Sequence, residues 1–191
     1  MEPILLASAS ARRSELLRRV GVPFRARKPR VDESAGLPAA AADRVLVLAE
    51  RKVRAVLAAR GSARWVLGCD TLVEAGGALL GKPSDRQEAA GYLRLLSGRE
   101  HSVHSGLALY SAAADAIQVR LATTRVVFRD LDDAEIDWYL STREWRGAAG
   151  AYRIQERGAF LVTAVDGSYS NVVGLPLETF YGMLRSGGYR F

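Results

Sequence analysis

Two arginines stand at the start of a predicted helix, a place where cations are normally disfavoured. The run Ile4 to Ala7 has the composition of a short buried strand, and Ser10 is placed to cap the helix that follows. Arg12 and Arg13 then fall in the first turn, at the positive end of the helix dipole, which costs roughly a few tenths of a kcal/mol. A bound anion would remove that cost, so these arginines with Ser8 and Ser10 form a candidate phosphate site. Two solvated arginines behind an ordinary cap are the alternative.

Asp70 is the carboxylate whose position in the sequence most clearly suggests a role in binding or catalysis. It follows the apolar run 65–69, so we expect it at the end of a buried strand, where α/β folds gather ligands. A carboxylate there can bind a divalent cation or accept a proton from water. The alternative is an aspartate that caps a turn. Glu33 lies in a polar loop and, considered by itself, is a solvated side chain; with Asp70 it becomes a candidate metal ligand.

Only three of the 27 basic residues are lysines, which makes each of them informative. Lys28 lies in a basic loop. Lys52 lies in a predicted helix rich in Ala and Leu, where a lysine usually extends to solvent. Lys82 stands between Gly81 and Pro83, which predict a rigid turn that projects its ammonium group. Together with the two carboxylates and the paired arginines, Lys52 and Lys82 suit a metal–polyphosphate complex.

Composition excludes several classes of protein. With 191 residues, 49% of them hydrophobic, the chain fits one globular domain, or one domain with two lobes. No apolar run approaches the ~20 residues of a membrane span. The net charge of +6 invites a nucleic-acid hypothesis, but the basic residues are spread along the chain. The single cysteine, Cys69, suits a reducing compartment. We therefore expect a cytoplasmic protein that binds neither membranes nor nucleic acid.

The elements that must position these residues alternate between helices and strands. The apolar patterning predicts helices over 10–21, 38–61, 84–96, 132–141 and 175–184, and strands over 4–7, 24–27, 65–69, 78–80, 100–112, 117–129 and 160–165. A hairpin is expected around Gly76 and Gly77, and the two longest strands form an antiparallel pair. His101 and His104 then point to opposite faces of one strand, which argues against a two-histidine metal site. The prediction is a mixed-sheet α/β fold.

Six motifs in register resemble the Maf family of nucleotide pyrophosphatases. They are Ser8-Ala9-Ser10-Ala11-Arg12-Arg13, Cys69-Asp70-Thr71, Gly81-Lys82-Pro83, Leu96-Ser97-Gly98-Arg99-Glu100-His101, Gly150-Ala151-Tyr152-Arg153-Ile154-Gln155 and the run from Gly167 to Pro176. The resemblance covers essentially the whole chain. It implies one elongated, two-lobed domain over residues 1–191, similar to the inosine-triphosphate pyrophosphatases, with a central nucleotide cleft. It also implies hydrolysis of a nucleoside triphosphate to the monophosphate and pyrophosphate.

The resemblance also implies roles for single residues. The aspartate that matches Asp70 is the proposed proton acceptor, and the positions of Arg12, Thr71 and Gln155 match the branch that acts on dTTP and UTP rather than on 7-methyl-GTP. This chain departs from the family pattern at Ala148, where a lysine is usual, so one phosphate contact is either missing or supplied by a neighbouring arginine, namely Arg146 or Arg153. Ser105 replaces the more usual threonine.

These observations predict a nucleoside triphosphate pyrophosphatase with Asp70, Lys82 and Lys52 as catalytic groups. The expected substrate contacts come from Ser8, Ser10, Arg12, Arg13, Thr71 and Gln155. Glu33 and Asp70 are the expected ligands of a divalent cation, Mg²⁺ or Mn²⁺. The alternative function is a non-catalytic regulator of cell division that binds a nucleotide or a protein through the same cleft. The sequence leaves the oligomeric state open, and a homodimer is compatible with it.

Overall fold

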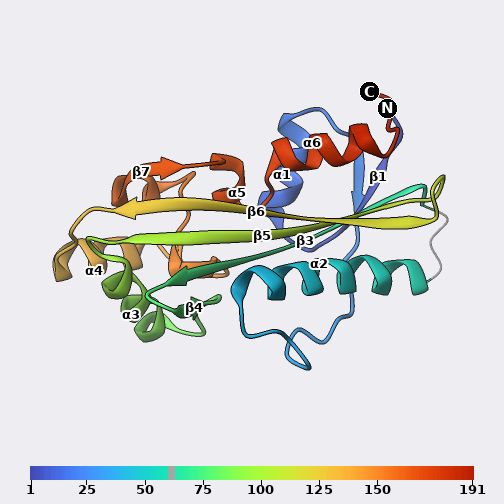
Figure 1. Cartoon of the computed structure of the whole chain (residues 1–191). Helices are drawn as coiled ribbons and strands as arrows, with labels where there is room; N and C mark the ends of the chain where they lie inside the picture. The colour runs from blue at the N-terminus through green and yellow to red at the C-terminus, as the bar shows by residue number, and fades with distance from the viewer. Residues whose placement is uncertain (60–62) are drawn as a thin grey trace. The chain divides into compact units, whose positions relative to one another are not determined.

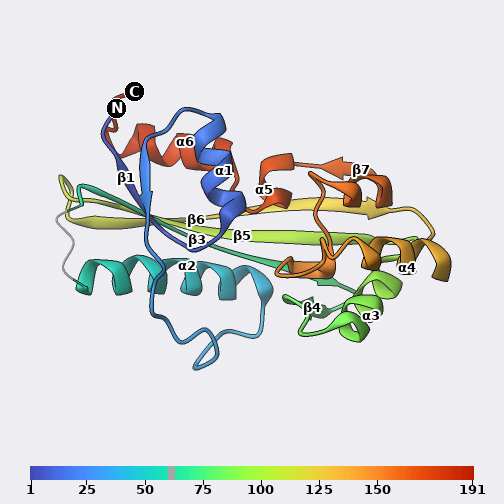
Figure 2. The same cartoon turned by 180° about the vertical axis from the view of Figure 1, so that it is seen from behind.

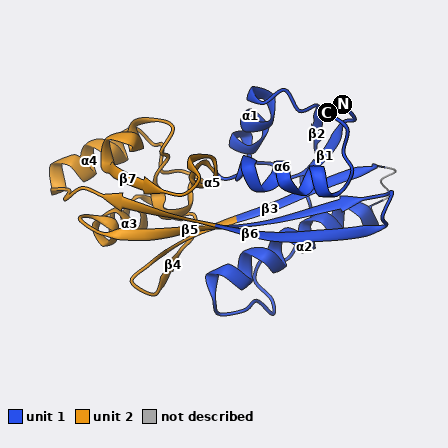
Figure 3. Cartoon of the chain, turned by 45° about the horizontal axis from the view of Figure 1, so that its top comes forward, with its two compact units in different colours: residues 1–70, 105–122, 174–191 blue, residues 71–104, 123–173 orange. Residues whose placement is uncertain are grey.

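The computed structural model describes residues 1–59 and 63–191, and in this part the chain has the predicted mixed α/β fold (Figure 1). Two compact units make up the chain. Unit 1 comprises residues 1–70, 105–122 and 174–191, and unit 2 comprises residues 71–104 and 123–173 (Figure 3). None of the helices in the described ranges combines the length and apolarity that a membrane crossing requires.

Three strands contribute residues to both units, because the chain passes from one unit to the other within them. These strands are β3 (Trp65–Ala75), β5 (Glu100–Ser111) and β6 (Ala116–Phe128). The boundary in β3 falls between Asp70 and Thr71. Two residues that are adjacent in sequence and both predicted to serve the site therefore belong to different units.

In unit 1 the strand order is β2-β1-β3-β5-β6. The short strand β1 (Ile4–Ala7) pairs in parallel with both β2 (Phe24–Ala26) and β3. Helix α2 (Ala41–Ala58) covers one face of this sheet, and α1 (Ala11–Arg19) and α6 (Leu177–Ser186) lie on the other, as Figures 1 and 2 both show. The parallel pairing places the carboxyl end of β1 next to the middle of β3.

Small residues let α2 approach the sheet of unit 1 closely. The core between them is built from Ala7, Ala49, Val53, Val56, Val66 and Ala108. A Cβ atom added at Gly68 of β3 would overlap the backbone carbonyl of Ala49 in α2. Gly106 of β5 approaches the Val45 carbonyl in the same way. This close packing brings the α2 side chains within reach of the polar residues of β3.

Unit 2 packs helices around the other ends of the long strands. It contains β4 (Ala78–Leu80), which forms a hairpin with β3, and β7 (Val162–Asp166), which pairs antiparallel with β6. Its helices are α3 (Arg86–Leu96), α4 (Asp133–Ser141) and α5 (Tyr169–Val173), with 3₁₀ turns η1 (Ala149–Ala151) and η2 (Arg157–Leu161). Helix α3 contacts both α4 and η1, and β4 contacts η1.

Several boundaries differ from those predicted. Strand β3 does not end at Asp70 but continues to Ala75, because Thr71, Leu72 and Val73 all favour extended backbone. Helix α2 begins at Ala41, and its predicted end at Gly61 lies outside the described residues. Helix α5 and the 3₁₀ turns η1 and η2 were not predicted, because each spans five residues or fewer.

Candidate active site

The turn between β1 and α1 is held by a buried arginine. Ser10 caps α1 by accepting a hydrogen bond from the Arg13 backbone N–H at 3.4 Å. The Arg13 side chain donates to the Ser8 hydroxyl at 3.2 Å and to the Gly174 carbonyl at 2.8 Å. The alternative of two solvated arginines is therefore wrong for Arg13, which is buried, whereas Arg12 is half-buried.

The Gly174 carbonyl also connects this turn to β3. It accepts from the Cys69 thiol at 3.4 Å as well as from Arg13. Cys69 is buried and directly precedes Asp70. The fold of unit 1 thus brings the Ser8–Arg13 turn beside the strand that carries Asp70, as the grouping of these residues in one predicted site requires.

A lysine lies between the two carboxylates that were predicted to bind a metal. Lys52 Nζ forms an ion pair with Asp70 Oδ1 and lies 2.9 Å from Glu33 Oε1. The exposed fractions of the side chains are 8% for Lys52, 13% for Asp70 and 54% for Glu33. Lys52 therefore points inward from α2, and the expectation that such a lysine extends to solvent is wrong here. Its ammonium is a charge removed from water and compensated by two carboxylates.

The loop that carries Glu33 is fastened to α2. Arg51, next to Lys52, donates to the carbonyls of Ala35 at 2.8 Å and Gly36 at 3.3 Å. Within the loop, Asp32 accepts bonds from the Ser34 hydroxyl and backbone N–H, which lower the pKa of the Asp32 carboxyl. These contacts hold the exposed Glu33 close to α2 and the ammonium of Lys52.

Unit 2 brings two of the predicted motifs together. The Gly150 backbone N–H donates to the Gly81 carbonyl at 3.1 Å, which joins the Gly81–Pro83 turn to the Gly150–Gln155 segment. Lys82, in that turn, is exposed. The Gln155 side-chain oxygen is buried and has no hydrogen-bond partner among the described residues. Thr71, at the start of this unit, is half-buried.

Buried polar residues of unit 2 were not predicted as functional. Tyr139 and Tyr152 were missed, and His101 was considered only as a metal ligand. The structure pairs Tyr139 with the Arg153 backbone and Tyr152 with His101. The signal that could have found them is the position of Tyr152 inside the Gly150–Gln155 motif.

At position 148, where the family pattern has a lysine, the alanine is surrounded in sequence by two arginines, Arg146 and Arg153. Ala148 is buried. Arg153 donates to the Arg146 carbonyl at 2.8 Å and lies 3.5 Å from the Glu156 carboxylate, so its guanidinium contacts its own segment. The guanidinium of Arg146, an exposed residue, lies 5.4 Å from the centre of the Trp145 ring.

Comparison with known proteins gives full-length matches. A family model described as Maf-like protein matches residues 3–187. The chain is 46% identical to a dTTP/UTP pyrophosphatase of Pelotomaculum thermopropionicum over 99% of this chain and 98% of that protein. It is 47% identical to a dTTP/UTP pyrophosphatase of Symbiobacterium thermophilum, over 99% and 96%. A solved nucleoside-triphosphatase / dITP/XTP pyrophosphatase from Mycobacterium abscessus matches 68% of this chain and 75% of its own, at 18% identity and a TM-score of 0.42.

Proposed function

This chain belongs to the family of Maf-like proteins, and on that premise we propose that it hydrolyses dTTP and UTP to the monophosphate and pyrophosphate. The names of its relatives at 46% and 47% identity support the substrate class. The observation that supports the proposal is the buried ion pair of Lys52 with Asp70, because binding a nucleotide requires no such carboxylate. That contact favours an enzyme over a non-catalytic regulator.

Asp70 is the proposed general base. Water attacks the α-phosphorus, its proton passes to the Asp70 carboxylate, and the bond between the α-phosphorus and the bridging oxygen breaks as pyrophosphate leaves. Lys52 orients that carboxylate through their ion pair. In the partly dry environment of Lys52, its positive charge also stabilises the negative charge that develops on the phosphoryl oxygens.

The proposed phosphate contacts are cations and hydroxyls. In unit 1 these are Ser8, Ser10, Arg12 and Arg13, of which Arg13 is held by Ser8 and Gly174 and is thereby preorganised. In unit 2 the contact is Lys82, whose exposed ammonium stands on a turn tied to the Gly150 backbone. Arginine forks and lysine point charges are the usual phosphate ligands.

The carboxylates of Glu33 and Asp70 fit a divalent cation, Mg²⁺ or Mn²⁺. Both contact the Lys52 ammonium through one oxygen each, so a cation beside that ammonium would be bound by the other oxygens of the two carboxylates, the kind of ligand that Mg²⁺ prefers. Within residues 1–59 and 63–191, no group of three or more His, Cys, Asp and Glu side chains could hold a metal. A cation held by Glu33 and Asp70 would neutralise negative charge on the triphosphate.

Base recognition is assigned to Arg12, Thr71 and Gln155. The buried Gln155 oxygen lacks a hydrogen-bond partner among the described residues, and a pyrimidine imide N–H would supply a donor. A nucleotide substrate and a single free cysteine both suit a reducing compartment, so the cytoplasm remains the proposed location.

The test is pyrophosphate release from dTTP, UTP, CTP, GTP and 7-methyl-GTP with Mg²⁺ or Mn²⁺. We expect the highest kcat/KM for dTTP and UTP. Gln155→Ala should lower kcat/KM for these two by about tenfold to a hundredfold, because a buried hydrogen-bonding group of the base loses its partner. Hydrolysis of the purine nucleotides should change little.

Gln87→Ala is the matched control, since Gln87 is an exposed glutamine of α3 in the same unit. A wild-type protein that prefers 7-methyl-GTP, or that releases no pyrophosphate from any of the five, would contradict the proposal. An equal loss on all substrates in Gln155→Ala would make Gln155 structural or catalytic instead.

A further inference from the structure

The segment from Gly150 to Gln155 is positioned by buried side chains rather than by a strand ladder. We propose that Tyr139 and the His101–Tyr152 pair are positioning residues that fix the Gln155 amide and so set the selectivity between nucleobases. This inference rests on the proposed role of Gln155 in base recognition. It assigns a function to buried polar groups that neither the triphosphate contacts nor the proposed proton transfer requires.

The backbone of this segment lacks regular structure. Gly150 and Ala151 have φ angles of 68° and 63°, in the left-handed region that favours glycine. Residues 152–156 lie between the two 3₁₀ turns and belong to no helix or strand. A Cβ atom added at Gly150 would lie 3.0 Å from the Val73 side chain, so the segment is closely packed where it begins. Its path must therefore be held by other groups.

Tyr139 holds the segment two residues before Gln155. Its hydroxyl accepts a hydrogen bond from the Arg153 backbone N–H at 3.0 Å. The ring is fully buried on α4, a helix whose start is secured by a capping box between Asp132 and Glu135. Burial raises the pKa of the Tyr139 phenol, so the group that meets the N–H is neutral. A rigid helix thus fixes the backbone near the amide.

His101 holds the segment at Tyr152, three residues before Gln155. The His101 Nε2 and Tyr152 hydroxyl lie 2.8 Å apart, and both residues are buried. Their rings meet edge to face with each other and with Phe128, at centroid distances between 4.8 and 5.5 Å. Burial lowers the pKa of His101 to about 4, so the ring is neutral at neutral pH. The pair forms an uncharged, closely packed anchor.

Two anchors at positions 152 and 153, just before Gln155, would affect the base more than the triphosphate. A hydrogen bond weakens steeply when its geometry is lost, so a small displacement of the amide removes much of its discrimination. Phosphate contacts through Lys82 depend on charge and tolerate such a displacement better. The expected effect of losing an anchor is therefore a change in the ratio of kcat/KM values between pyrimidine and purine nucleotides.

The experiment measures that ratio, dTTP over GTP, in four variants. Tyr139→Phe removes the acceptor of the Arg153 N–H, and His101→Leu removes the partner of Tyr152; each should lower the ratio about tenfold. His101→Gln places an amide nitrogen where Nε2 lay and should restore most of the ratio. Tyr92→Phe is the control, because it removes a phenol that bonds to Glu88 at 2.7 Å on the exposed side of α3.

Thermal unfolding of each variant separates positioning from stability. The inference is wrong if Tyr139→Phe and His101→Leu keep the wild-type ratio, or if they lower kcat/KM equally for both nucleotides. It is also wrong if His101→Gln behaves like His101→Leu at equal stability. Should Tyr139→Phe fail to fold, the comparison of the two His101 variants decides. A wild type without pyrimidine preference would instead overturn the proposed function, and the inference with it.

Discussion

Charged groups dominate the candidate residues of unit 1, whereas those of unit 2 are largely neutral. In unit 1 the buried contacts are Lys52 with Asp70 and Arg13 with Ser8 and Gly174, and the exposed Glu33 also pairs with Lys52. In unit 2 they are Tyr139 with the Arg153 backbone and His101 with Tyr152, beside the buried Gln155 oxygen. The exception in unit 2 is Lys82, which is exposed.

The difference matches two tasks with different physical demands. Charge–charge attraction falls slowly with distance, so a half-exposed loop residue such as Glu33 can contribute without exact placement. A neutral hydrogen bond requires its donor and acceptor within a narrow range of distance and angle. Under the proposed function, the charged groups of unit 1 act mainly on phosphate, and the buried Gln155 of unit 2 acts on the base. Three predictions test this division.

The largest effect is expected from Asp70→Asn in unit 1. The amide keeps the shape of the side chain but neither carries the charge that pairs with Lys52 nor accepts the proton of the attacking water. We expect kcat to fall by about a hundredfold or more, on the scale of general-base catalysis. Steady-state kinetics on dTTP measures this, together with the unfolding midpoint.

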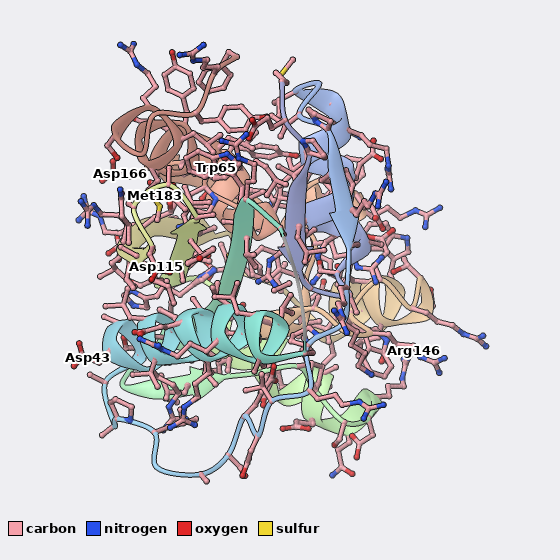
Figure 4. All side chains as sticks on the ribbon, turned by 90° about the vertical axis from the view of Figure 1, so that its right-hand side faces the viewer. Asp43, Trp65, Asp115, Arg146, Asp166 and Met183 are labelled. Atoms are coloured by element: carbon pink, nitrogen blue, oxygen red, sulfur yellow. The ribbon has the colours of Figure 1, made fainter. Side chains whose placement is uncertain are left out.

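Asp43→Asn is the control for this change. Asp43 lies in the exposed first turn of α2, and Figure 4 shows it at the outside of that helix. Loss of its charge should lower the free energy of unfolding by a few tenths of a kcal/mol, roughly the contribution of a carboxylate at a helix start. Near-normal turnover in a folded Asp70→Asn protein would remove Asp70 from the mechanism and unit 1 from the catalytic role.

A second effect concerns the neutrality of the His101 anchor in unit 2. The unfolded chain binds a proton at this histidine below about pH 6.5, and the folded chain only below about pH 4. Between these values the unfolded state binds more protons, so the free energy of unfolding decreases as the pH falls. Because of His101, the free energy of unfolding should be lower by about 3 kcal/mol at pH 4 than at pH 7, and this decrease should level off below pH 4.

Denaturant unfolding between pH 7 and pH 4 compares wild type with His101→Gln, which cannot titrate in this range. The wild type should lose more stability than the variant by that amount. If the two proteins lost stability equally as the pH falls, His101 would have its ordinary pKa in the folded state. The anchor would then not stay neutral.

The smallest effect is expected from Lys82→Ala, which removes the cation of unit 2. Because the Lys82 side chain is exposed, its interaction with phosphate is screened, and kcat/KM should fall by about fivefold. Added salt should reduce the difference from wild type. Lys28→Ala, at another exposed lysine, should have no effect on kcat/KM. Equal kcat/KM values for the two variants would mean that Lys82 is a solvated side chain without contact to phosphate.

The sequence by itself determined the element types and most of the candidate motifs. Periodicity and capping residues are local, so the helices capped by Ser10 and Asp132 could be predicted, and the structure confirms these caps. For the helix predicted to start at Ser84 or Asp85, the structure shows that Asp85 is the cap. The family resemblance likewise depends on short motifs in register. Even the hairpin between β3 and β4 follows from the local Gly76-Gly77 pair.

Tertiary structure decided which of these residues meet and in which state. Lys52 has the sequence context of a solvated lysine, and only the packing of α2 on β3 turns it toward Asp70, a contact across 18 positions of the chain. Arg13 is buried because Gly174, at the other end of the chain, accepts its hydrogen bond. His101 is neutral because Phe128 and Tyr152 remove it from water. The burial of a side chain and its ion pairs depend on neighbours that are distant in sequence, so no local pattern encodes them.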